Sequence, residues 1–218
     1  SVLFLGFGGP EKPEQIMPFL RNVVFGRGIP DERLAAVEHH YHDVGGRSPD
    51  NVLTERQRLG VERFLRAHGV DLPVYVAMRN WDPYMHDVIA QMNQVGKKHA
   101  LGVILAGHRS EVSWERYKGD VTCAIVGNGG VGPHVTYLDA WYDHPRFLEA
   151  NAQLIELASG KKRGAWPADL PVLFTAHSIP SAAAKSPMTS DLLGSFPVSR
   201  WPKRLVVPHD CMGPTRRS

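Results

Sequence analysis

Along the chain, short continuous runs of apolar residues alternate with segments in which apolar residues recur every three or four positions. Four short continuous runs have the length of buried strands. They are residues 2–7, 73–78, 100–106 and 171–176. Between and beside them, apolar residues three or four positions apart predict helices. These cover residues 13–24, 32–42, 52–67, 82–96, 111–126 and 145–158. Strands alternating with helices predict right-handed crossovers, a mainly parallel sheet and therefore an α/β fold.

The loops that follow the predicted strands are the expected place for chemistry, because ligands of such sheets bind at the carboxyl ends of the strands. Four loops fall at these ends: residues 6–10, 79–82, 107–110 and 177–180. A glycine-rich stretch at 127–132 is the expected linker between an N-terminal unit and the start of a second one.

Composition supports a folded, water-soluble protein. Of 218 residues, 43% are apolar and 22% are charged, which is enough to build a core. No stretch approaches the roughly 20 apolar residues that a transmembrane helix needs. Two cysteines, Cys123 and Cys211, cannot form a disulfide framework or a four-thiolate site. We therefore expect a reduced, cytoplasmic protein without an iron–sulfur cluster held by this chain alone.

The net charge of +3 is unevenly distributed. Residues 178–218 contain six basic and two acidic residues and six of the 17 prolines, so the rest of the chain is close to neutral. A nucleic-acid-binding protein would carry its basic residues on the folded body, so we expect no nucleic-acid partner.

Two strand-end loops carry candidate functional side chains. His177 follows its strand directly and is either a proton acceptor or metal ligand, or a histidine packed at the strand end. Arg79 can bind a carboxylate of a ligand and Trp81 can contact a flat ring. The alternative is a solvated arginine beside a half-buried tryptophan.

Other motifs have an ordinary structural interpretation beside the functional one. The glycines of residues 6–10 form a phosphate cradle or, as we favour, a tight turn. Ser48, before the helix at 52, binds an anion or simply begins the helix. The histidines at 39, 40 and 42 lack the spacing of a structural zinc site, so we interpret them as a polar helix face.

Seven of these fragments together resemble one family, the ferrochelatases, over about residues 1–184. The fragments are Leu5–Glu11, Pro18–Val23, Tyr41–Pro49, Val76–Pro83, His108–Ser110 with Arg116–Tyr117, His144–Phe147 and Phe174–Pro180. They occur in the family's order, and the last is its most diagnostic stretch. The resemblance implies insertion of Fe²⁺, as a substrate, into a porphyrin such as protoporphyrin IX or coproporphyrin III in haem biosynthesis.

The resemblance also implies roles for individual residues. His177 takes the place of the family's catalytic histidine, which acts as base and iron ligand. Phe7 stands where family members place a residue against the macrocycle, and as a phenylalanine it cannot ligate iron. The segments that line the substrate site further contain Tyr41, Ser48, Arg79, Ser110 and Tyr117. Arg109 departs from the family's usual aromatic residue.

The family fold has two similar α/β halves. The resemblance therefore implies a parallel-sheet, chelatase-like fold in which this chain holds the first, Rossmann-like half and the start of the second. We expect residues 1–132 to form the first domain and 133–187 to begin the second. Residues 188–218 are then a divergent basic, proline-rich tail.

The end of the chain departs from the family. The second half of a ferrochelatase supplies an acidic residue opposite the histidine, yet no glutamate follows His177. We therefore hypothesise a truncated or frame-disrupted ferrochelatase whose family sequence ends near residue 187, with impaired activity. Two alternatives stay open: a non-catalytic remnant that binds porphyrin, and a chelatase that loads another tetrapyrrole with cobalt.

Overall fold

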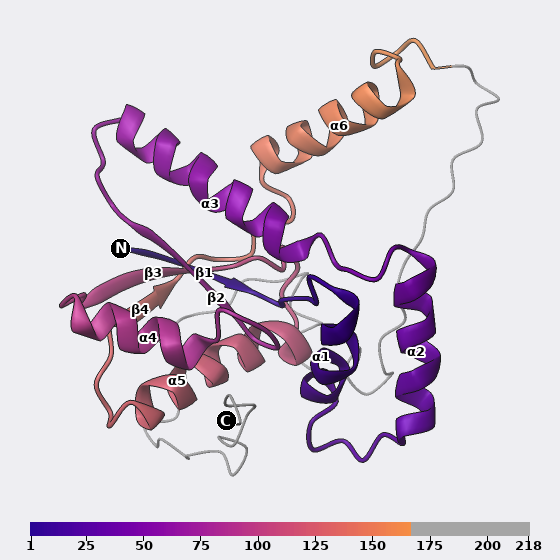
Figure 1. The fold of residues 1–218 in the computed structure, drawn as a ribbon. Coiled ribbons are helices and arrows are strands. Elements are labelled where there is room, and N and C mark those ends of the chain that lie inside the picture. Colours follow the sequence, from indigo (N-terminus) through magenta and orange to yellow (C-terminus); the bar gives the residue numbers. More distant parts are fainter. Residues whose placement is uncertain (167–218) are drawn as a thin grey trace. The chain divides into compact units, whose positions relative to one another are not determined.

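The computed structural model describes residues 1–166 (Figure 1). These residues fall into two compact units. The first unit comprises residues 1–106 and 113–138. The described part of the second unit comprises residues 107–112 and 139–166. The predicted strand at 171–176, His177 and the proline-rich tail lie outside the described residues.

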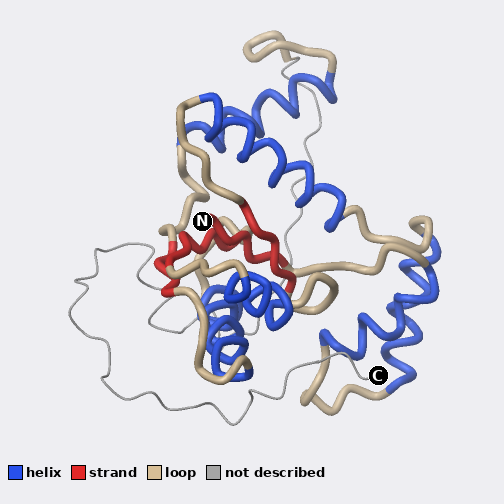
Figure 2. The backbone as a smooth tube through the Cα atoms, turned by 60° about the vertical axis from the view of Figure 1, so that its left-hand side comes forward, coloured by secondary structure: helices blue, strands red, loops and turns tan. Residues whose placement is uncertain are grey.

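The first unit is built on one parallel sheet of four strands, shown in red in Figure 2. The strands are β1 (Val2–Gly6), β2 (Val74–Met78), β3 (His99–Ile104) and β4 (His134–Tyr137). Their order across the sheet is β2-β1-β3-β4, and every neighbouring pair is parallel. This confirms the predicted α/β fold, and it places β1, the first strand in sequence, in the interior of the sheet.

Helices connect the strands, as the spacing of apolar residues predicts. They are η1 (Pro13–Gln15), α1 (Ile16–Val23), α2 (Asp31–Asp43), α3 (Asp50–Ala67), α4 (Met85–Gln94), η2 (Glu111–Glu115), α5 (Arg116–Gly127) and α6 (Pro145–Ser159). The expected helix at 111–126 begins with η2, a single π-helical turn. The expected helix at 82–96 begins only at Met85, after a cis Asp82–Pro83 peptide.

Successive residues of β1 point to opposite faces of the sheet, and both faces are covered. Val2 and Phe4 pack with Val74 against apolar side chains of α3. Leu3 and Leu5 are fully buried on the other face, where α4 and α5 lie (Figure 1). A strand buried on both sides reads as a continuous apolar run, which is why residues 2–6 could be recognised from sequence.

Strand β4 is the one element of the first unit that the sequence analysis missed. It pairs with β3, with His134 beside His99 and Tyr137 beside Gly102. Because β4 belongs to the same sheet as β1, the first unit extends to Leu138 instead of ending at 132. The signal was weak: four residues, of which only two are half-buried, do not form an apolar run.

The described part of the second unit contains α6, a helix that begins at Pro145 and ends at Gly160 in the left-handed conformation. None of the residues of α6 is buried. Among the described residues, no helix is long and apolar enough to cross a membrane. In the first unit, Cys123 lies on α5, and Cys211 lies outside the described residues.

Candidate functional site

Hydrogen bonds join the loops that follow β1 and β2 at the carboxyl edge of the sheet. The backbone N–H of Arg79 donates to the carbonyl of Gly6 at 3.0 Å. Asn80 donates to the carbonyl of Phe7 twice, from its backbone at 3.0 Å and from its side chain at 3.2 Å. The sheet therefore brings two of the four predicted loops together, because their strands are neighbours.

The glycine loop after β1 packs closely on the beginning of α3. The backbone N–H of Gly8 donates to Asp50 Oδ2 at 3.0 Å, and that of Gly9 donates to Asn51 Oδ1 at 3.1 Å. A Cβ atom on Gly9 would lie 2.5 Å from Ser48 Cβ. These two N–H groups already have protein acceptors, so the structure favours the tight turn over the phosphate cradle.

Ser48 lies between the glycine loop and α3. Its backbone N–H donates to the carbonyl of Pro10 at 2.7 Å, and its Oγ accepts from the backbone N–H of Asp50 at 3.2 Å. The side chain thus helps begin α3, as one of the two interpretations holds. Its hydroxyl proton remains available as a donor, since the bond to Asp50 uses an oxygen lone pair.

Four aromatic side chains gather beside the glycine loop, and we call them the aromatic cluster. Phe19 of α1 is its centre and is 2% exposed. The rings of Phe7, Tyr41 and Trp81 lie 6.2, 6.3 and 6.1 Å from that of Phe19, all edge to face. Phe7 remains 46% exposed, so the cluster presents an aromatic surface at the strand ends. It unites Phe7 and Tyr41, two of the predicted residues.

A charged pair lies at the end of β2. Arg79 Nε is 2.9 Å from Asp120 Oδ2 of α5, and the guanidinium carbon of Arg79 is 5.8 Å from the centre of the Tyr117 ring. Arg79 and Tyr117 were predicted from sequence, whereas Asp120 was not. Its position three residues after Tyr117 places it on the neighbouring turn of the same helix face, which is a signal that could have identified it.

Burial is the largest cause of the pKa shifts of Arg79, Asp120 and the nearby tyrosines. It raises the pKa of Tyr117 to about 12, against an opposing effect of Arg79. Burial also raises the pKa of Asp120 and lowers that of Arg79, and each partner opposes the shift of the other. The pKa of Tyr41 is raised first by burial and then by the charge of Asp50. Both phenols therefore keep their protons near neutral pH and can donate hydrogen bonds.

The remaining predicted residues are not part of this arrangement. Ser110 belongs to the second unit and is half-buried there. In the same unit, His108 stacks on Tyr142 with ring centres 5.0 Å apart, and Trp141 meets Phe147 edge to face at 4.7 Å. His177, predicted as the catalytic residue and metal ligand, lies outside the described residues.

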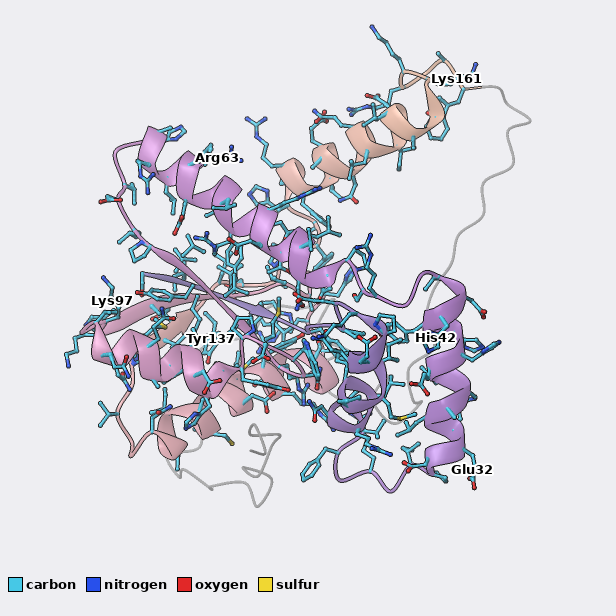
Figure 3. The ribbon with its side chains drawn as sticks, in the orientation of Figure 1. Glu32, His42, Arg63, Lys97, Tyr137 and Lys161 are labelled. Atoms are coloured by element: carbon cyan, nitrogen blue, oxygen red, sulfur yellow. The ribbon has the colours of Figure 1, made fainter. Side chains whose placement is uncertain are left out.

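Metal-ligating side chains do not cluster within the part of the chain that the structure describes. There, no group of three or more His, Cys, Asp or Glu residues could hold a metal ion. His39, His40 and His42 are all exposed on α2, where Figure 3 shows His42 projecting from the helix. This is the polar helix face that the sequence analysis favours.

Comparison with known proteins gives a consistent result. The model of the Ferrochelatase family matches residues 1–189. A coproporphyrin III ferrochelatase of Nocardia farcinica (strain IFM 10152) is 42% identical over 187 residues, which is 84% of this chain and 52% of that protein. One of Mycobacterium sp. (strain JLS) is 41% identical over 187 residues, with 84% and 53% covered.

A third relative extends the match slightly further along the chain. The coproporphyrin III ferrochelatase of Corynebacterium glutamicum (strain R) is 39% identical over 200 residues, covering 89% of this chain and 54% of its own length. The chain thus spans about half the length of the curated relatives it matches.

Proposed function

This chain belongs to the ferrochelatase family, and from that premise we propose that it is part of an enzyme that inserts ferrous iron into a porphyrin in haem biosynthesis. The observation that carries the proposal is the match of residues 1–189 to the family, joined to relatives about 40% identical over more than four-fifths of the chain. In this reaction both Fe²⁺ and the porphyrin are substrates.

The chemistry of the reaction assigns a role to His177. Metal insertion displaces two protons from the pyrrole nitrogens, so a base has to lie close to the ring. A neutral imidazole can accept a proton near pH 7 or ligate a divalent metal ion. We assign both the base and the iron ligand to His177 on its place in the Phe174–Pro180 motif.

The aromatic cluster suits the macrocycle face. A flat apolar ring binds well against aromatic side chains, and Phe7 is the exposed member of the cluster. Phe7 has no atom that could ligate iron, so it contributes contact area alone. Tyr41 is packed on the same Phe19 ring and is placed to add a phenol donor.

The carboxylates of the substrate require hydrogen-bond donors. Arg79, Ser48, Tyr117 and, from the second unit, Ser110 are the donors we assign to them. The relatives named above are coproporphyrin III ferrochelatases, so we propose coproporphyrin III, with four carboxylates, ahead of protoporphyrin IX. We also propose a cytoplasmic site of action.

One observation favours a second, more limited function for the 218-residue polypeptide. It spans about half the length of the relatives it matches, and the described residues hold the aromatic cluster and Arg79. We therefore propose that this polypeptide, tested by itself, binds porphyrin. Insertion of cobalt into another tetrapyrrole is disfavoured by the His-Ser-Ile-Pro sequence at 177–180.

Two experiments test the proposal. Fluorescence titration of the purified chain with coproporphyrin III should give saturable binding, and the absence of binding would contradict it. In a version extended to the length of its relatives, His177→Ala should reduce iron insertion by roughly 10²-fold or more while porphyrin affinity changes little. The matched control is His42→Ala, on the exposed face of α2 (Figure 3), which should change neither quantity. Loss of binding and insertion together would make His177 a structural residue.

A further inference from the structure

Arg79 is a partly enclosed cation whose position needs an explanation. Its side chain is 20% exposed, and burial is the largest influence on its pKa, which it lowers. A cation in this setting has to be compensated by a nearby negative charge, or its desolvation destabilises the fold. Among the described residues, the ion pair with Asp120, at 2.9 Å, is the compensation that Arg79 has.

The contact between the two groups leaves donors on Arg79 unused. Asp120 Oδ2 is enclosed yet accepts no hydrogen bond within residues 1–166, so Arg79 Nε approaches it without pointing its N–H at it. A guanidinium has five N–H donors in a planar fork. The Arg79 side chain makes no hydrogen bond to any of the described residues, so these donors are free for an acceptor that enters the site.

Three contacts fix where the guanidinium lies. The backbone of Arg79 is tied to Gly6, Asp120 lies against Nε, and the Tyr117 ring lies beside the guanidinium at 5.8 Å. Tyr117 is itself 5% exposed and so cannot move away easily. An arginine held in this way gives up less conformational freedom when it binds a ligand.

The charge around the pair is not balanced by Asp120 alone. Arg116 and Arg27 are both close enough to act on the charge of Arg79, and Arg116 also acts on Asp120. Arg79 and Arg116 thus both act on Asp120, and Arg27 adds a further positive charge that acts on Arg79. An entering carboxylate is attracted by the excess positive charge and does not have to displace Asp120 from Arg79.

We propose that Asp120 is a positioning residue, which holds the Arg79 guanidinium beside the Tyr117 ring so that its free N–H groups receive a carboxylate of the porphyrin. The proposal rests on the porphyrin function proposed above. It adds a residue that acts on the substrate only through Arg79, and it predicts that the effect of Asp120 depends on the carboxylates of the ligand.

The test compares two ligands and three variants in the 218-residue chain. The ligands are coproporphyrin III and the same porphyrin with every carboxylate converted to a neutral amide. The variants Asp120→Asn, which keeps the side-chain shape, and Asp120→Ala should weaken binding of the acid by about tenfold and leave binding of the amide unchanged. Asp120→Glu, which restores the charge, should recover most of the affinity for the acid.

The control is another arginine–aspartate pair. Arg21 and Asp31 lie 3.1 Å apart with both side chains well exposed, so Asp31→Asn should change binding of neither ligand. In Arg79→Ala, Asp120→Asn should cause no further loss, because the residue acts through Arg79.

Any other result would contradict the proposed role of Asp120, and each result indicates a different alternative. Equal weakening of acid and amide by Asp120→Asn would make Asp120 a purely structural residue. Tighter binding of the acid would make it a competitor of the substrate for Arg79. An unmodified chain that binds neither ligand would contradict the proposed function itself, whereas unchanged binding in the Asp120 variants would contradict the positioning role alone.

Discussion

Two groups of side chains beside the β1 loop, which we call the two sides of the candidate site, are held by different forces. On one side, the aromatic cluster is an extension of the apolar core, with Phe19 fully buried and Phe7 at the surface. On the other, Arg79, Asp120 and Tyr117 form a group in which burial is the largest cause of every pKa shift. We infer that the two sides bind different parts of the porphyrin. The aromatic cluster binds the face of the ring, and the charged group binds the carboxylates.

The largest effect is expected at the centre of the aromatic cluster. Phe19→Ala removes a ring that contacts Phe7, Tyr41 and Trp81. We expect a loss of about 3–5 kcal/mol in the free energy of unfolding, since a buried phenylalanine leaves a cavity. Urea denaturation followed by circular dichroism measures it.

The matched control for Phe19→Ala is Phe25→Ala, a ring that is 57% exposed. It should change the free energy of unfolding by no more than about 0.5 kcal/mol. Similar losses in both variants would mean that Phe19 does not organise this side of the site.

On the charged side, we expect the free energy of unfolding to fall at high pH, where Tyr117 loses its proton. Because burial raises the pKa of Tyr117 to about 12, the folded chain keeps this proton when the unfolded chain loses it near pH 10. The contribution of Tyr117 to stability should be constant below about pH 10 and fall by about 2–3 kcal/mol as the pH rises towards 12. Urea midpoints across that range measure the decline.

Tyr117→Phe should make that decline shallower. Tyr137, whose pKa burial also raises, is present in both proteins and cancels in the comparison. An equal decline in both proteins would mean that Tyr117 is not buried as the structure has it.

The contact between the glycine loop and α3, which supports both sides, should show a smaller effect. In Gly9→Ala the new Cβ would lie 2.5 Å from Ser48 Cβ, so the loop and the helix have to separate. We expect a loss of about 1–3 kcal/mol in the free energy of unfolding.

Gly60→Ala is the matched control for Gly9→Ala. It places the same methyl group in the interior of α3 with no atom within 4 Å, and it should stabilise the chain by up to about 1 kcal/mol. If both substitutions had the same sign, the close contact at Gly9 would not be what limits that position.

Each side contains residues that the sequence predicts and residues that it misses. Phe7, Tyr41 and Arg79 could be nominated because each follows a strand or belongs to a family motif, and the order of the sheet then brings the first two loops together. The strand ends were predictable because buried parallel strands are continuous apolar runs.

Other features depend on contacts that no local pattern contains. Phe19 is an ordinary apolar residue of a helix until the fold places three rings around it. The spacing of Asp120 from Tyr117 places it on the same face of α5, but its ion pair with Arg79 forms only because α5 lies beside the end of β2. Strand β4 was missed because it is short and only partly buried, so its pairing with β3 defines it rather than its hydrophobicity.

The most direct test that the two sides bind different parts of the porphyrin measures dissociation constants for three proteins and two ligands. The proteins are the unmodified chain, Phe7→Ala and Arg79→Ala, and the ligands are coproporphyrin III and its neutral amide. We predict that Phe7→Ala weakens binding of both ligands by a similar factor, whereas Arg79→Ala weakens binding of the acid alone, by about tenfold. Equal losses for both ligands in Arg79→Ala, or no loss in either variant, would contradict it.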